Sequence, residues 1–253
     1  MTPLVPVPLL SARGLRKDFG GIRAVNDVSF DLYPGELVAL IGPNGAGKST
    51  CFNLLNGQIR PDAGRVLLDG EDITGLPPRL AWRRGIGRGF QVAETFSSMT
   101  VRDAARMPLI ARHHAVWRFF GPAGGLFNDD VDVLLAEVGL SALADRGCGV
   151  LAHGDRKRLD LALAIAHRPR LLLMDEPAAG MAAGDRGRLM DLVRRLARDR
   201  GCAVLFTEHD MDIVFHFADR ILVMDRGELI AAGAPESVRA DPRVRAAYLG
   251  SDP

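Results

Sequence analysis

One stretch of the sequence fits the spacing G-x-x-x-x-G-K-[ST], a pattern that cradles a nucleoside triphosphate. Its glycines let successive backbone N–H groups turn inward around phosphate oxygens, where a Cβ atom would clash. Lys48 adds a mobile positive charge for the β- and γ-phosphates, and Ser49 offers a hydroxyl to Mg²⁺. A glycine-rich turn can match this spacing by chance, but the flanking sequence favours a binding loop. The candidate ATP-binding residues are Gly42, Pro43, Asn44, Gly45, Ala46, Gly47, Lys48, Ser49 and Thr50.

Two carboxylates directly follow an apolar run over residues 171–174. Open α/β sheets place ligands at the carboxyl ends of their strands. Consecutive side chains that leave a strand diverge, so the two carboxylates can do different work. We expect Asp175 to hold Mg²⁺ and Glu176 to polarise the water that attacks a phosphate. The alternative, an acidic loop after a buried strand, is weakened by the phosphate-binding pattern in the same chain.

Three further side chains have roles that the residues alone leave open. Gln91 follows a short strand, and its amide can contact Mg²⁺ or the attacking water; a loop glutamine is the alternative. His209 follows an apolar strand and can donate a hydrogen bond to the γ-phosphate, although most single histidines at strand ends are structural or solvated. Phe19 can stack on adenine through its ring face. Packing in the core is the alternative for Phe19.

A second candidate anion site precedes a helix that we expect over residues 156–167. Small residues at a helix N-terminus expose backbone N–H groups to an anion. A capped helix is the alternative, with Asp155 accepting from the early N–H groups. The residues of this stretch are Leu151, Ala152, His153, Gly154 and Asp155.

An open sheet is needed to hold these residues, and the apolar patterns predict one. Residues 36–41 predict a buried strand that leads into the phosphate-binding loop, and residues 49–56 predict the helix after it. Periodicity is helical over about residues 92–166, and short apolar runs separated by helices resume after residue 170. We therefore expect an α/β core with a helical insertion. Further strands are expected over residues 9–16, 24–33, 65–70, 86–90, 171–174, 203–207 and 221–224, and short surface helices over residues 235–249.

The composition is that of a globular protein with a substantial core. The chain has 253 residues, 47% of them hydrophobic and 25% charged. Its net charge of +1 gives no overall field that favours nucleic acid or an anionic membrane. The three cysteines lack metal-ligand spacing and are typical of reduced thiols. No apolar run approaches the roughly 20 residues of a membrane span, and the N-terminus lacks the basic region of a signal peptide.

The order of these motifs resembles the ATP-binding cassette of ABC transporters over nearly the whole chain. The resemblance implies one ATPase domain over residues 8–250. That fold is a P-loop NTPase core with a mixed, mainly parallel sheet, an antiparallel N-terminal sheet and a helical subdomain over about residues 92–166. Residues 235–250 are then surface helices at the C-terminus.

The resemblance also implies how the site works. ATP and Mg²⁺ are the expected cofactors, with Ser49, Gln91 and Asp175 around the metal. Glu176, His209 and Gln91 are the expected catalytic residues. The chain is expected to form a head-to-tail homodimer, or a heterodimer with a related ATPase subunit. In that dimer the stretch from Leu151 to Asp155 completes the partner's site.

A narrower resemblance is to the subfamily that serves branched-chain amino-acid importers. It implies uptake of branched-chain amino acids or a related small polar solute through separate integral-membrane permease subunits, with a substrate-binding protein acting indirectly. The expected location is the cytoplasmic face of the inner membrane, as a peripheral subunit that does not bind nucleic acid. The segments that carry this resemblance are residues 19–26, 175–181, 208–211 and 244–250.

The chain departs from the family pattern at two places. The common signature reads Leu-Ser-Gly-Gly-Gln, and Ala152, His153 and Asp155 replace three of its residues. The missing serine removes a hydroxyl donor, and the carboxylate of Asp155 repels a triphosphate unless the basic residues 156–158 offset its charge. Ala182 stands where the family often has Asp or Asn, and its methyl group cannot make the cross-dimer hydrogen bond of those residues.

Two other functions compete with the importer hypothesis. A soluble ABC-type ATPase acting on nucleic acid or ribosomes usually has two cassettes, a long coiled coil or a basic linker, and this sequence has none of these. A nucleotide-binding regulatory module without turnover is opposed by the intact set of Lys48, Asp175, Glu176 and His209.

Overall fold

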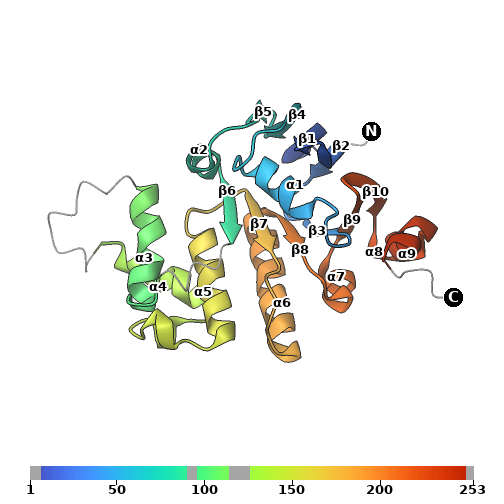
Figure 1. The fold of residues 1–253 in the computed structure, drawn as a ribbon. Helices are drawn as coiled ribbons and strands as arrows, with labels where there is room; N and C mark the ends of the chain where they lie inside the picture. Colours follow the sequence, from blue (N-terminus) through green and yellow to red (C-terminus); the bar gives the residue numbers. More distant parts are fainter. Residues whose placement is uncertain (1–6, 90–95, 114–125, 249–253) are drawn as a thin grey trace, which may run out of the picture.

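A sheet in the strand order β10-β9-β3-β8-β7-β6 forms the centre of the computed structural model, which describes residues 7–89, 96–113 and 126–248 (Figure 1). Strands β9, β3, β8, β7 and β6 run parallel, and β10 pairs antiparallel with β9. The mixed, mainly parallel sheet expected from the sequence is therefore confirmed. Its strands are β3 (Leu37–Ile41), β6 (Ile86–Gly89), β7 (Leu171–Asp175), β8 (Ala203–Thr207), β9 (Arg220–Asp225) and β10 (Glu228–Gly233).

A second sheet, in the order β2-β1-β4-β5, is antiparallel throughout, as expected for the N-terminal region. Its first two strands are longer than the sequence patterns predict because a two-residue turn joins them. Gly20 and Gly21 form that turn with φ angles of 53° and 88°, which residues with a side chain rarely adopt. The strands are β1 (Leu10–Phe19), β2 (Ile22–Leu32), β4 (Ala63–Leu68) and β5 (Glu71–Asp72).

Strand β3 is buried on both faces, which explains its unbroken apolar run. Leu37, Ala39 and Ile41 pack into a core shared with α5, α6 and α7. Val38 and Leu40 pack into a second core with α1 and the antiparallel sheet. The loop between β3 and α1 is thus held between two packed layers. The helices are α1 (Lys48–Leu55), α5 (His153–Ile165), α6 (Ala183–Arg200) and α7 (Met211–Phe217).

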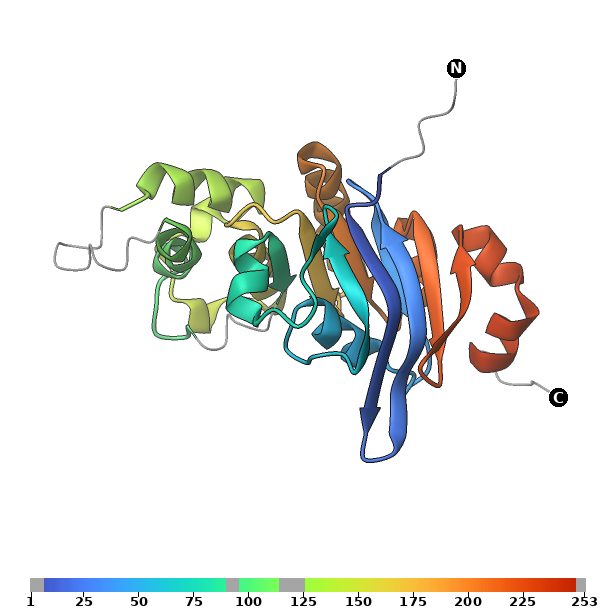
Figure 2. The same cartoon turned by 90° about the horizontal axis from the view of Figure 1, so that it is seen from above.

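Helices α3, α4 and α5 gather at one end of the central sheet, and α8 and α9 lie at the other (Figures 1 and 2). Helices α3, α4 and α5 lie within residues 92–166, where the apolar residues recur with the periodicity of a helix. Short 3₁₀ turns at Ser141–Leu143 and Cys148–Val150 lead into α5. Within the described residues no helix is both long and apolar enough to cross a bilayer. The remaining bounds are α2 (Pro78–Arg83), α3 (Val101–Arg112), α4 (Asn128–Glu137), α8 (Pro235–Ala240) and α9 (Pro242–Tyr248).

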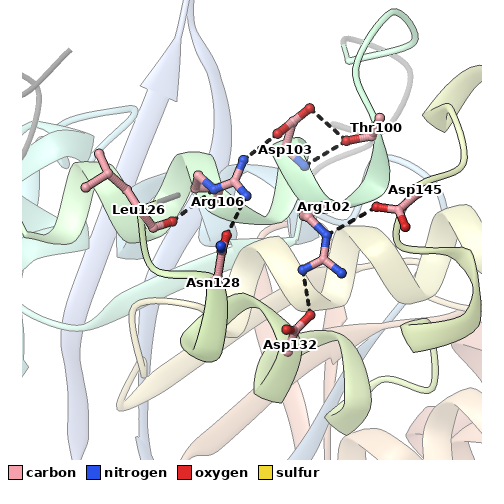
Figure 3. A network of polar contacts seen from close by, with 8 residues as sticks. All are labelled: Thr100, Arg102, Asp103, Arg106, Leu126, Asn128, Asp132 and Asp145. Atoms are coloured by element: carbon pink, nitrogen blue, oxygen red, sulfur yellow. Dashed lines mark hydrogen bonds and ion pairs between the residues drawn. The ribbon is translucent and has the colours of Figure 1, made fainter. Parts of the chain in front are cut away.

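A buried arginine ties α3 to the start of α4 (Figure 3). Arg106 is only 4% exposed. Its guanidinium donates to the carbonyl of Leu126 at 2.9 Å and to Oδ1 of Asn128 at 3.0 Å, and it forms an ion pair with Asp103. A buried charge is costly unless it is paired and hydrogen-bonded. These three partners therefore fix the approach of the chain into α4.

Arg102, one turn earlier in α3, makes a more exposed bridge in the same network (Figure 3). It contacts Asp132 in α4 at 2.6 Å and Asp145 in the following loop at 3.3 Å. Thr100 caps the helix, since its hydroxyl accepts from the backbone N–H of Asp103 at 3.1 Å. The network fixes α3 and α4 relative to each other.

Helix α2 and strands β5 and β10 were not predicted from the sequence. Helix α2 begins at Pro78, a residue suited to the first helical position. The helix is too short for a helical repeat of apolar residues to be recognised in the sequence. Strand β10 is an edge strand joined to β9 by a tight turn at Arg226 and Gly227, whose φ angles are 45° and 83°. No residue of β10 is fully buried, so it lacks the apolar pattern by which strands are recognised.

Candidate active site

The phosphate-binding loop turns between the end of β3 and the start of α1. An added Cβ atom would lie 2.1 Å from the carbonyl oxygen of Met224 at Gly42 and 2.2 Å from that of Ala24 at Gly47. Both positions therefore require glycine for close packing as well as for their positive φ angles. Helix α1 begins at Lys48, so its N-terminal N–H groups open onto the loop. This is the geometry that an anion cradle needs, and phosphate binding by the loop stays a prediction.

Lys48 lies beside the loop and near both predicted carboxylates. Its Nζ atom donates to the carbonyl oxygens of Gly42 at 2.6 Å and Pro43 at 3.1 Å. Burial lowers the pKa of Lys48, and the negative charges of Glu176 and Asp175 partly offset this effect. The structure thus brings together the cation and the two carboxylates, although more than 120 residues separate them in sequence.

Asp175 ends β7, and its neighbour in β8 orients its side chain. The buried Thr207 hydroxyl donates to Oδ1 of Asp175 at 2.6 Å. Asp175 and Ser49 are both exposed at the loop side of the sheet. An oriented carboxylate and a hydroxyl are donors that suit Mg²⁺, which binds through few protein ligands together with phosphates. These two residues fit the predicted metal site.

Glu176 is held in an unusual backbone conformation, with a φ of 48°. Its N–H donates to the backbone oxygen of Thr207 at 3.2 Å and to the Thr207 hydroxyl at 3.1 Å. Its Oε1 lies 2.9 Å from Nε2 of His209. Left-handed backbone in a non-glycine residue persists only where the surroundings enforce it, often at functional sites. Here it aims the carboxylate at the histidine.

Sequence reasoning missed the role of Glu208, which anchors the loop after Glu176. Glu208 is 4% exposed, and its Oε1 accepts from the backbone N–H of Ala178 at 2.7 Å. Burial raises the pKa of Glu208, while the backbone donors lower it. A carboxylate after an apolar strand was visible in the sequence. Nothing in the pattern says which of several adjacent carboxylates turns inward.

The stretch from Leu151 to Asp155 differs from its prediction in where the helix begins. The expected start at residue 156 is wrong, because the Arg156 N–H already bonds to the Ala152 carbonyl at 3.0 Å. His153, Gly154 and Asp155 therefore form the first turn of α5. Ala152 is the N-cap, and no side chain caps the helix, so the alternative of a cap by Asp155 is not supported.

The charge of Asp155 has a partner. Its Oδ1 lies 3.6 Å from NH1 of Arg158, one turn along α5. This basic residue offsets the carboxylate that the sequence placed near a triphosphate. Leu151 is buried, and its carbonyl accepts from Nε of Arg156 at 3.1 Å. Ala152 and His153 are exposed at the helix start.

Phe19 ends β1 at the hairpin tip and is 45% exposed. Packing in the core, the alternative interpretation of this residue, is therefore wrong. The Lys17 Nζ lies 5.5 Å from the ring centroid, so one face of the ring contacts a cation. Gln91 lies outside the described residues.

The loop, its cation and the carboxylates at the strand ends define a P-loop nucleotide-binding protein. A family model described as ABC transporter matches residues 25–179, and one described as branched-chain amino acid ATP-binding cassette transporter matches residues 228–253. This chain belongs to the ABC transporter family, as an ATP-binding subunit.

Several relatives are similar over almost their full length. The high-affinity branched-chain amino acid transport ATP-binding proteins LivG of Escherichia coli and BraF of Pseudomonas aeruginosa are each 39% identical, covering 96% of this chain and 98% of each relative. A solved structure of an ATP-binding cassette of an ABC transporter in its ADP conformation is 31% identical, with a TM-score of 0.85 over 97% of this chain and 100% of that one. These relatives support the expected transporter family and give no support to the nucleic-acid alternative.

Proposed function

We propose that this chain is the ATP-hydrolysing subunit of an importer for branched-chain amino acids or a related small polar solute. The observation that carries the hydrolytic part is the contact of Glu176 with His209 at 2.9 Å, beside the loop that holds Lys48. The printed names of the relatives and the match of residues 228–253 to a branched-chain amino-acid transporter model support the solute class.

In this proposal each residue has one task. The backbone N–H groups of residues 44–50 and the side chain of Lys48 hold the phosphates within the loop of residues 42–50. The exposed Phe19 stacks on adenine. Ser49, Asp175 and Gln91 hold Mg²⁺, which neutralises charge on the phosphates. Glu176 polarises the attacking water, and His209 keeps that carboxylate oriented and contacts the γ-phosphate.

We further propose that residues 8–250 act as one ATPase domain, with residues 92–166 as its helical subdomain. Two such subunits, identical or related, pair head to tail. The signature stretch Leu151–Asp155 of each then faces the phosphate-binding loop of the other. The pair works with integral-membrane permease subunits at the cytoplasmic face of the inner membrane, and a substrate-binding protein acts through those permeases.

Uptake by the assembled transporter tests the proposal. Proteoliposomes or cells containing the permeases and binding protein, with either wild-type chain or Glu176→Gln, receive radiolabelled leucine, isoleucine, valine or urea. We expect ATP-dependent uptake of an aliphatic amino acid that Glu176→Gln abolishes. Uptake of urea alone would select the related polar solute over an amino acid, whereas ATP-dependent uptake of none of these solutes contradicts the solute class. Undiminished uptake with Glu176→Gln contradicts the hydrolytic role.

A further inference from the structure

The first turn of α5 contacts the loop that follows Glu176. Nε2 of His153 lies 3.1 Å from the carbonyl oxygen of Ala179. A carbonyl only accepts, so Nε2 carries the hydrogen and donates it. The next residue, Gly180, has a φ of 76°, and a Cβ atom there would lie 3.1 Å from Nε2. The missing side chain leaves room for the imidazole against the loop.

A second contact joins the same helix to the same loop. Lys157, one turn after His153, donates from Nζ to the carbonyl oxygen of Glu176 at 3.4 Å. On its other side the loop is fixed by the bond from the Ala178 N–H to Glu208. The short segment that begins at Glu176 is therefore held between α5 and the end of β8.

The contact by His153 is an addition to the common signature. That signature has glycine at this position, which offers no side-chain donor to the loop. Here the imidazole extends from the signature turn to the loop carbonyl, three residues after the carboxylate proposed to polarise water. One end of the contact lies in the signature stretch, and the other lies in the loop that follows Glu176. The proposed function assigns a role to both.

We propose that His153 is a positioning residue that sets the place of Glu176 through the Ala179 carbonyl. It links the helix facing the partner's nucleotide to the carboxylate of its own subunit's site. This inference rests on the proposed function, because it assigns the contact an effect on hydrolysis. His153 itself does not touch the reacting atoms in this role.

Two substitutions distinguish loss of the His153 contact from a general loss of folding. His153→Ala removes the donor, whereas His153→Gln keeps an N–H donor at similar reach. His113→Ala, at the exposed end of α3, is the matched control. Hydrogen exchange of residues 176–182 is measured in the purified chain, and kcat and KM for ATP in the chain assembled with its membrane partners.

We expect His153→Ala to speed exchange in residues 176–182 and to lower kcat by about fivefold, the factor that corresponds to loss of about 1 kcal/mol. KM is expected to stay within about twofold, since in the proposed role His153 acts on the loop after Glu176 and not on the nucleotide. His153→Gln restores both quantities, and His113→Ala changes neither.

Two results would overturn the inference. Exchange and kcat equal to wild type in His153→Ala would show that the contact positions nothing. Unchanged exchange with a KM for ATP raised well beyond twofold would show that His153 serves the partner's nucleotide instead. A wild-type chain without ATPase activity would refute the proposed function separately, and the exchange comparison would still support or overturn the positioning contact.

Discussion

Glu176 and His209 lie 2.9 Å apart, although they extend from the ends of two different strands, β7 and β8. These strands pair in parallel with Asp175 opposite Thr207, so their carboxyl ends meet at one edge of the sheet. The pairing register places the carboxylate and the imidazole together. Glu176 lies one residue beyond β7 and His209 two residues beyond β8, so the sheet register brings both to the same edge.

Glu176→Gln should trap ATP and stabilise a dimer. Glutamine keeps the shape of the side chain but removes the charge that polarises water. Size-exclusion chromatography with ATP and Mg²⁺ should show a dimer for this variant and less of it for wild type. Glu236→Gln, on exposed α8, is the control and should elute like wild type. A Glu176→Gln variant that remains monomeric with ATP would count against the model.

Lys48→Ala should abolish nucleotide binding. The ammonium is the positive charge of the cradle, and hydrogen bonds to charged groups contribute about 1.5–3 kcal/mol each. Titration with a fluorescent ATP analogue should show a Kd raised by roughly 100-fold or more. Arg195→Ala removes an exposed charge from α6 and should bind normally. Equal affinity of Lys48→Ala and wild type would refute the cradle.

Arg106→Ala should destabilise the fold far more than Arg102→Ala. Removing the buried Arg106 takes a donor from Asp103, the Leu126 carbonyl and Asn128, a loss of about 2–3 kcal/mol. Arg102 is 27% exposed in its side chain, and its pairs should contribute about 1 kcal/mol or less. Urea unfolding followed by circular dichroism measures both. Similar losses would show that burial of Arg106 is unimportant.

Acid should destabilise the protein partly through His167. Burial lowers the pKa of His167 to about 4, against an ordinary value of 6.5, and its ring stacks on Trp82 with centroids 4.6 Å apart. Between those pH values the unfolded chain binds a proton that the folded chain does not. The contribution of His167 to the free energy of unfolding should therefore fall as the pH drops from about 6.5 to about 4. Above that range this contribution should stay level.

His167→Leu isolates this contribution. It removes the titrating group, so the free energy of unfolding of the variant should improve relative to wild type as the pH falls, by up to roughly 3 kcal/mol. Denaturant curves at pH 7, 5.5 and 4.5 provide the comparison. A constant difference between the two proteins across this range would contradict the assignment.

Local spacing was enough to predict the phosphate-binding loop and the Asp175–Glu176 pair. In each case a buried strand and a short motif adjoin in sequence, so the chemistry can be inferred without knowing the packing. The strand order that brings Lys48 near those carboxylates was not predicted and became visible only in the fold.

Contacts between distant segments could not be predicted in the same way. The inward turn of Glu208 and the bond from His153 to Ala179 depend on how α5 and β8 flank one loop. The start of α5 was misplaced because no capping side chain marks it. Phe19 is exposed because the hairpin extends beyond the core, which the residue type alone does not show.

Phosphate release by the chain assembled with its permease subunits tests the central claim most directly. With Mg²⁺ and ATP, we predict steady release by wild type and by Glu236→Gln. Glu176→Gln should release phosphate at least about 100-fold more slowly, as expected when a general base is lost. Equal rates for Glu176→Gln and wild type, or no release by wild type, would contradict the account.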